Sequence, residues 1–96
     1  MNDTPKRRPS DYVRKGWCQG SIARDAQGKS CLDTSPDAVQ WYIYGAVSAA
    51  YPYDIQKRGE ILDKLPLPTN VPLGRWNDDP KRTQAEVIAL LTSIGE

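Results

Sequence analysis

The feature that most constrains the fold is the chain's longest apolar stretch, PDAVQWYIYGAVSAA, at residues 36–50. Its apolar side chains recur at intervals of three and four, as on one face of a helix: Val39, Tyr42, Ile43, Ala46, Val47 and Ala50. Pro36 suits a first helical position, and Thr34 or Ser35 before it offers a cap. The stretch predicts a helix from about Pro36 to Ala50 at the buried centre of the fold.

Two further elements are predicted in the first third of the chain. A short helix begins near Ser10, and Gly16 supplies a left-handed residue after Lys15. The sequence DAQG at residues 25–28 has Asp first and Gly fourth, as in a type I turn closed by a glycine bulge. It predicts a β-hairpin in which Arg24 faces Ser30, Ala23 faces Cys31, and Cys31 does not meet Cys18.

The second half of the chain predicts two more helices separated by a loop. Residues 53–65 have a helical pattern weakened by Gly59. Three prolines in residues 66–72 forbid a regular helix there, so we expect an extended loop over residues 66–74. Thr83 and Glu86 form a capping box ahead of a helix with Val87, Leu90, Leu91 and Ile94 on its inner face. The expected fold is α+β and mainly helical, with three to four helices around a central helix plus one hairpin.

The chain of 96 residues is long enough for one small domain, which we place at residues 10–96. Residues 1–9 carry Lys6, Arg7 and Arg8 between prolines and predict a flexible basic arm. The net charge of +1 provides no general attraction to nucleic acid or anionic membranes. Neither a signal peptide nor a long apolar span is visible, so we expect a soluble, cytoplasmic protein.

The chain contains no histidine, which excludes Ser-His-Asp and Cys-His catalysis and His-ligated zinc. Cys18 and Cys31 are the only cysteines, and we expect two free thiols because no base stands ready to activate either. Asp78 and Asp79 are consecutive, whereas calcium loops place oxygen ligands at alternate positions. We therefore expect no enzymatic activity, no cofactor and no metal.

Three segments, GWCQGSIARDAQG, PDAVQWYIYGAV and RWNDDPKRTQAEVIALL, resemble an uncharacterised family of small proteins encoded by bacteria and by phages or other mobile elements. The matching positions are Gly16, Trp17, Gln19, Gly20, Ala23, Arg24, Asp25 and Gly28, then Ala38, Val39 and Trp41, then Trp76, Asn77, Asp78, Pro80, Arg82, Thr83, Glu86 and Val87. The resemblance implies a common fold and carries no known activity. A mobile-element origin would suit interference with a host or defence protein.

The sequence favours a module that binds another protein through the hairpin tip, residues 24–29, and the RWNDD loop, residues 75–79. The candidate contact residues are Arg24, Asp25, Arg75, Trp76, Asn77, Asp78 and Arg82, with Trp17, Gln19 and Trp41 as supporting residues. Ion pairs are expected between Arg24 and Asp25 and between Asp78 and Arg82.

Two alternatives stay open at this point. In the first, Trp17, Trp41 and Trp76 line a cleft for a small ligand, in a binding protein or a minimal enzyme that uses carboxylates and Arg. In the second, the basic arm binds nucleic acid.

Overall fold

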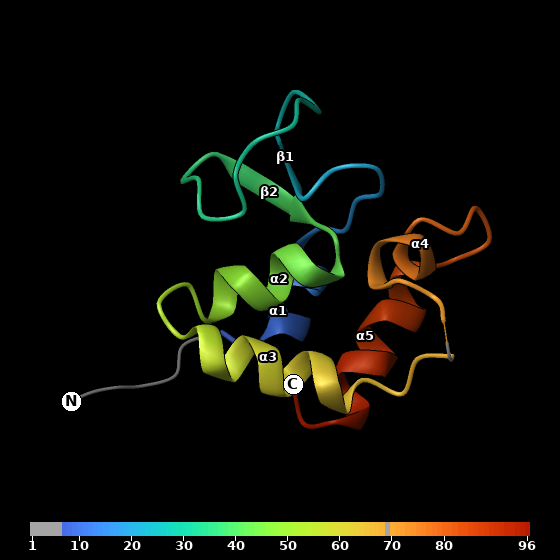
Figure 1. Ribbon diagram of the computed structural model, residues 1–96. Helices are drawn as coiled ribbons and strands as arrows, with labels where there is room; N and C mark the ends of the chain where they lie inside the picture. Colours follow the sequence, from blue (N-terminus) through green and yellow to red (C-terminus); the bar gives the residue numbers. More distant parts are fainter. Residues whose placement is uncertain (1–6, 69) are drawn as a thin grey trace.

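The computed structural model describes residues 7–68 and 70–96 (Figure 1). Within them the order of elements is α1 (Pro9–Lys15), β1 (Ala23–Asp25), β2 (Ala38–Trp41), α2 (Ile43–Ala50), α3 (Ile55–Lys64), α4 (Leu73–Asn77) and α5 (Gln84–Ser93). The small sheet lies at one end of the helical assembly, next to α2. The predicted α+β, mainly helical fold is confirmed.

Helix α2 lies at the centre, where it packs against α1, α3 and α4. The core combines side chains from the sheet, from helices α1, α2, α3 and α5, and from Leu65 just after α3: Val13, Ala23, Ala38, Trp41, Ile43, Ala46, Val47, Ile61, Leu65, Val87 and Leu91. The prediction of a central helix is therefore confirmed for residues 43–50.

The first part of the predicted helix 36–50 is wrong, because residues 38–41 form strand β2. Strand β2 pairs antiparallel with β1, with Ala23 opposite Trp41 and Arg24 opposite Gln40. Ala38 and Trp41 at its two ends are buried and Val39 is exposed, and the ladder is irregular between the pairs of Arg24 and Asp25. Pairing with a distant segment thus outweighs the helical period. Neither Thr34 nor Ser35 caps α2, which begins after Tyr42.

Short stretches of backbone extend the sheet on both sides. On one side Trp17 forms a parallel bridge with Trp41. On the other side the predicted turn is present: Gly28 N donates to Asp25 O at 2.9 Å, and Arg24 bridges Ser30 as expected. The hairpin arm at residues 29–31 therefore flanks β1, while the main ladder joins β1 to β2.

Gly16 is required for a different reason from the one predicted. Its φ of −176° is extended and not left-handed, so it is not a left-handed helix end. A Cβ at this position would lie 2.1 Å from Val39 O. Gly16 therefore lets the backbone after α1 approach β2 closely, and Trp41 N donates to Gly16 O at 3.0 Å.

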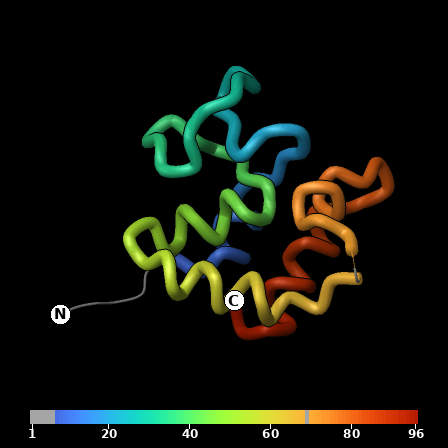
Figure 2. The backbone as a smooth tube through the Cα atoms, viewed as in Figure 1, coloured from blue at the N-terminus to red at the C-terminus, as the bar shows by residue number. Residues whose placement is uncertain are grey.

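The chain's last described residue returns to α1 (Figure 2). Ser10 is buried inside this helix, which starts at Pro9 after Arg8, so Ser10 is not the predicted cap. Its backbone N and its Oγ both donate to Glu96 O, at 3.0 Å and 2.8 Å. The start of α1 and the end of the chain are thereby joined.

The remaining helices follow the sequence pattern closely. Helix α3 spans Gly59 without a break, and α5 begins with the predicted Thr83–Glu86 capping box. The short helix α4 starts at Leu73, inside the predicted loop.

None of the helices in the described part of the chain is long and apolar enough to cross a membrane. Residues 1–6 of the predicted arm lie outside the described residues.

Candidate functional site

The structure brings the RWNDD loop against residues 17–20, which precede the hairpin. The Gln19 side chain donates to Asn77 O at 2.9 Å and to Asp79 O at 2.8 Å. Gly20 N donates to Asp78 Oδ1 at 3.0 Å. Gln19 thus supports this loop as predicted, and the contacts tie the two segments together inside the molecule.

Asn77 is fully buried, so its assignment to an exposed partner surface is wrong. Its Oδ1 accepts hydrogen bonds from Trp17 Nε1 at 2.9 Å and from Ile43 N at 3.0 Å. Its Nδ2 donates to Cys18 O at 3.1 Å and to Asp78 Oδ1 at 3.0 Å. All the hydrogen-bonding capacity of this amide is used, which explains why it tolerates burial.

The predicted ion pair between Arg24 and Asp25 is wrong among the described residues. Neighbouring side chains of a strand point to opposite faces, so these two diverge. Arg24 donates from Nη1 to Gly28 O at 2.9 Å and from Nη2 to Gln19 O at 3.1 Å. Asp25 Oδ1 accepts from the backbone N of Gln27 and of Lys29. Both side chains therefore shape the hairpin tip.

Arg82 pairs with other carboxylates than the predicted Asp78. Its nearest acidic partners in the described chain are Glu86 at 3.6 Å and Asp79 at 4.0 Å. Its Nε donates to Trp76 O at 2.9 Å, and its guanidinium lies 3.8 Å from the centre of the Trp76 ring. This stacking holds the α4–α5 connection and covers one face of the indole.

Of the predicted contact residues, Asn77 alone is buried. Arg75 and Asp78 are exposed, and Arg24, Asp25, Trp76 and Arg82 are half-buried. Hydrogen bonds within the chain, from Arg24 to Gln19 and from residues 19–20 to the RWNDD loop, hold the hairpin tip and this loop together.

The cysteines are both free thiols. Cys18 is buried and its Sγ donates to Ser21 O at 3.4 Å. Burial raises the pKa of Cys18 above its usual value, and this effect exceeds the opposing effect of Arg24. A raised pKa reduces the thiolate fraction that a nucleophile needs. The described residues also contain no group of three or more Cys, Asp or Glu side chains placed to hold a metal ion.

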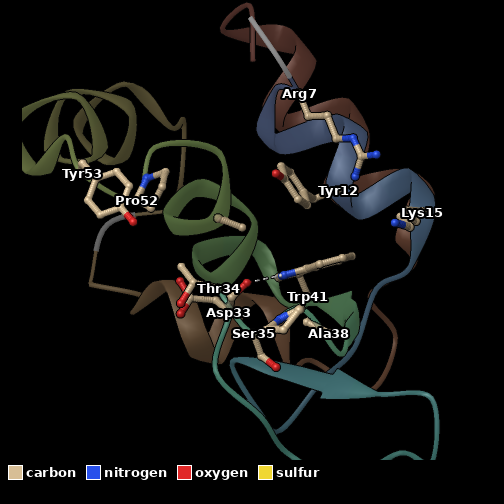
Figure 3. Close-up of a pocket in the computed structure, with 12 residues that line it drawn as sticks. Arg7, Tyr12, Lys15, Asp33, Thr34, Ser35, Ala38, Trp41, Pro52 and Tyr53 are labelled. Atoms are coloured by element: carbon tan, nitrogen blue, oxygen red, sulfur yellow. Dashed lines mark hydrogen bonds between the residues drawn. The ribbon is translucent and has the colours of Figure 1, made fainter.

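A pocket of about 340 Å³ lies on a different part of the molecule, between α1, the 33–38 turn and the α2–α3 connection (Figure 3). Its walls come from these elements: Arg7, Tyr12, Lys15, Asp33, Thr34, Ser35, Pro36, Ala38, Trp41, Ala49, Pro52 and Tyr53. Trp41 is buried in the wall and meets Tyr12 edge-to-face at 5.0 Å between ring centres. The other two indoles lie elsewhere: Trp17 bonds Asn77, and Trp76 stacks on Arg82. The predicted cleft shared by three tryptophans is therefore wrong.

Side chains of both positive and negative charge line the pocket. Arg7 and Lys15 come from the α1 side, and Asp33 comes from the turn before β2 (Figure 3). Asp33 Oδ2 is buried and has no hydrogen-bond partner within residues 7–68 and 70–96. Trp41 Nε1 donates to Asp33 O at 2.9 Å and so fixes this turn against β2. Among the described residues, Asp33 Oδ2 is the one buried side-chain oxygen or nitrogen without a hydrogen-bond partner.

Comparison with known proteins supplies a family. The model of a protein family of unknown function, DUF6197, matches residues 7–95. The chain belongs to this family. No curated protein and no solved structure shows significant similarity to it.

In this DUF6197 protein, sequence reasoning missed four pocket residues: Tyr12, Lys15, Asp33 and Tyr53. They come from three segments that are far apart in the sequence, at residues 12–15, 33 and 53, and that share no motif. The sequence offers one signal here, the segment PYD at residues 52–54, in which an aromatic residue stands between a proline and an aspartate. Assigning residues 38–41 to a helix also hid the contact between Asp33 and Trp41.

The basic residues near the start of this DUF6197 protein are partly engaged within the fold. Arg8 Nη1 donates to Gly95 O at 3.3 Å. Arg14 Nη1 pairs with Asp11 at 3.1 Å and donates to Ser10 Oγ at 3.3 Å. Arg7 and Lys15 line the pocket. Arg8 and Arg14 thus bond within the fold, whereas Arg7 and Lys15 lie at the pocket.

Proposed function

We propose that this chain is a small, non-enzymatic module that binds another protein through the pocket between α1, the 33–38 turn and the α2–α3 connection. The observation that carries the proposal is Tyr53, which is 98% exposed at the pocket. Tyrosine combines an apolar ring with a polar tip and is enriched among the residues that dominate protein interfaces.

Other exposed apolar side chains support the same face. Leu32 is 68% exposed and directly precedes Asp33, and Ile55 is 76% exposed two residues after Tyr53. Of the four large exposed apolar residues of the described chain, Tyr53 lines the pocket, and Leu32 and Val39 adjoin the lining residues Asp33 and Ala38 in the sequence. A polar rim around an apolar and aromatic centre is the usual composition of a binding surface.

The partner and its location are proposed on the sequence. We propose that the module works in the cytoplasm. The motif resemblance to proteins of phages and other mobile elements supports a partner from the host cell, such as a defence protein.

Affinity capture from the cells that produce the chain, followed by reconstitution with the purified partner, tests the proposal. Tyr53→Ala removes an exposed ring, so it should preserve the melting temperature and weaken the partner's Kd about tenfold or more. Arg75→Ala is the matched control on the RWNDD loop and should change Kd less than about twofold. Equal Kd values for Tyr53→Ala and the parent chain would refute the pocket as the binding site.

A small-ligand function is the second candidate, because about 340 Å³ with Trp41 in the wall lies in the range of ligand pockets. A thermal-shift screen against amino acids, nucleotides and metal ions separates the two functions. A ligand that binds only the folded state raises the melting temperature. A concentration-dependent rise that Asp33→Asn abolishes would favour the small ligand over a protein partner.

A further inference from the structure

The chemistry of the pocket's occupant follows from three described side chains that differ in charge. Asp33 stands on the 33–38 turn, while Arg7, two residues before α1, and Lys15, the last residue of α1, lie on the other side of Tyr12 and Trp41 (Figure 3). No ion pair within 4.0 Å joins Asp33 to either cation among the described residues. Both charge signs are consequently presented to whatever enters.

The turn that carries Asp33 is fixed by two hydrogen bonds. Its carbonyl accepts from Trp41 Nε1 at 2.9 Å, and Ser35 N donates to Leu32 O at 3.0 Å. Asp33 lines the pocket, and its Oδ2 is buried without a partner in the described chain. A buried charged acceptor is costly unless a donor reaches it, so an occupant of the pocket that donates to Asp33 would remove this cost.

The opposite wall favours an anion. Lys15 is exposed at the end of α1, and the Arg7 guanidinium lies 5.7 Å from the centre of the Tyr12 ring. A lone cation in the pocket would satisfy Asp33 but would face these two positive groups. A lone anion would suit Arg7 and Lys15 but would leave Asp33 unsatisfied and add repulsion. An occupant with both charges meets both walls.

We infer that the pocket recognises a dipolar group, with a positively charged nitrogen that donates to Asp33 and a carboxylate that faces Lys15 and Arg7. The apolar part between the two charges lies against Trp41 and Tyr12. The inference rests on the proposed function in one respect, the molecule that supplies the two charges. If the occupant is a partner protein, a Lys or Arg side chain supplies the positive charge and an acidic side chain supplies the negative charge. A free amino acid offers the same chemistry.

The Trp41 indole N–H provides a direct reporter, because it is bonded to Asp33 O in the pocket wall. Its NMR signal is followed during titration with β-alanine, γ-aminobutyrate and ε-aminocaproate, which separate an ammonium and a carboxylate by increasing distances. Butylamine and butyrate are the single-charge controls. At least one amino acid should bind about tenfold more tightly than either control.

Two variants assign the charges. Asp33→Asn should remove the advantage of the amino acid over butyrate, and Lys15→Gln should remove its advantage over butylamine. Lys15 is exposed, so its variant keeps the fold even if Asp33→Asn lowers the melting temperature. Equal binding of the amino acid and a single-charge control, or no movement of the indole signal with any probe, would overturn the inference.

A peptide arm separates this inference from the proposed function. Peptides blocked at both ends and carrying Lys and Glu at different spacings present the dipolar group as a protein would. Binding of these peptides with the same dependence on Asp33 and Lys15 supports both conclusions. Binding of the free amino acids without the peptides keeps the dipolar pocket and refutes the protein partner. Peptides that bind equally well after Asp33→Asn and Lys15→Gln would overturn the dipolar recognition.

Discussion

Asn77 joins three segments of the chain through one buried side chain. It bonds Trp17 and Cys18, which follow α1, and Ile43, the first residue of α2. Sequence reasoning assigned Asn77 to an exposed contact surface instead. It could not locate the partners, because they lie 34 to 60 residues away and depend on how α1, β2 and α4 assemble.

The Asn77 network predicts a large loss of stability on truncation. Asn77→Ala leaves Ile43 N and Cys18 O in the interior without partners, so the free energy of unfolding should fall by about 3 kcal/mol. Asn77→Asp keeps the shape but places a charge beside Asp78 and should also destabilise. Chemical denaturation followed by circular dichroism measures both.

Arg75→Ala is the control for these variants, because Arg75 is exposed on the same loop. Its free energy of unfolding should stay within about 0.5 kcal/mol of the parent value. A parent-like stability for Asn77→Ala would show that water replaces the amide and that the network is not structural.

At the scale of elements, the helical period of residues 36–50 was informative for only its second half. Residues 43–50 form a helix, as their apolar period predicts. Residues 38–41 instead form strand β2, which pairs with β1 on one side and contacts the backbone at Gly16 and Trp17 on the other. The capping box at Thr83 and the turn at Gly28 were predictable because they are local. The β1–β2 pairing is not local and was not predicted. Because this pairing positions Trp41 beside Asp33, the pocket was not predicted either.

Two helical glycines should respond in opposite ways to alanine. At Gly59 in α3 a Cβ meets nothing within 4 Å, so Gly59→Ala should stabilise the protein by about 0.5 to 1 kcal/mol through helix propensity. At Gly45 in α2 a Cβ would lie 2.2 Å from Ile22 O, so Gly45→Ala should destabilise despite the same propensity gain. Melting temperatures of the two variants provide the comparison, and a shift of the same sign in both would contradict this packing.

At the scale of the whole molecule, Glu96 ties the end of the chain to α1 and to the start of α3. Its backbone O accepts from Ser10, its Oε1 accepts from the Tyr51 hydroxyl at 2.9 Å, and its Oε2 lies 3.7 Å from Lys57 Nζ. These contacts close the fold around α2. Two walls of the pocket, α1 and the α2–α3 connection, are therefore both bonded to Glu96.

The Tyr51–Glu96 contact makes stability depend on alkaline pH. Burial first, and then the hydrogen bond and charge of Glu96, raise the pKa of Tyr51 from 10.0 to about 12. The folded state keeps the phenol proton where the unfolded chain has lost it. This contribution is therefore complete below about pH 10 and is lost as the pH rises towards about 12.

Tyr51→Phe isolates this contribution, since other groups titrate in the same range. The stability advantage of the parent chain over Tyr51→Phe should shrink between about pH 10 and about pH 12. Urea unfolding at a series of pH values gives both curves. If the free energies of unfolding of the two chains differ by a constant amount through this pH window, the fold does not raise the pKa of the Tyr51 hydroxyl.

We propose that the functional surface is the pocket between α1, the 33–38 turn and the α2–α3 connection, and not the hairpin tip with the RWNDD loop. The most direct measurement is an NMR titration of the labelled chain with the purified partner, in which each backbone amide and the Trp41 indole are followed. We predict that the largest shifts fall on the indole and on residues 33–38 and 51–55. Shifts concentrated on residues 24–29 and 75–82 would contradict the account.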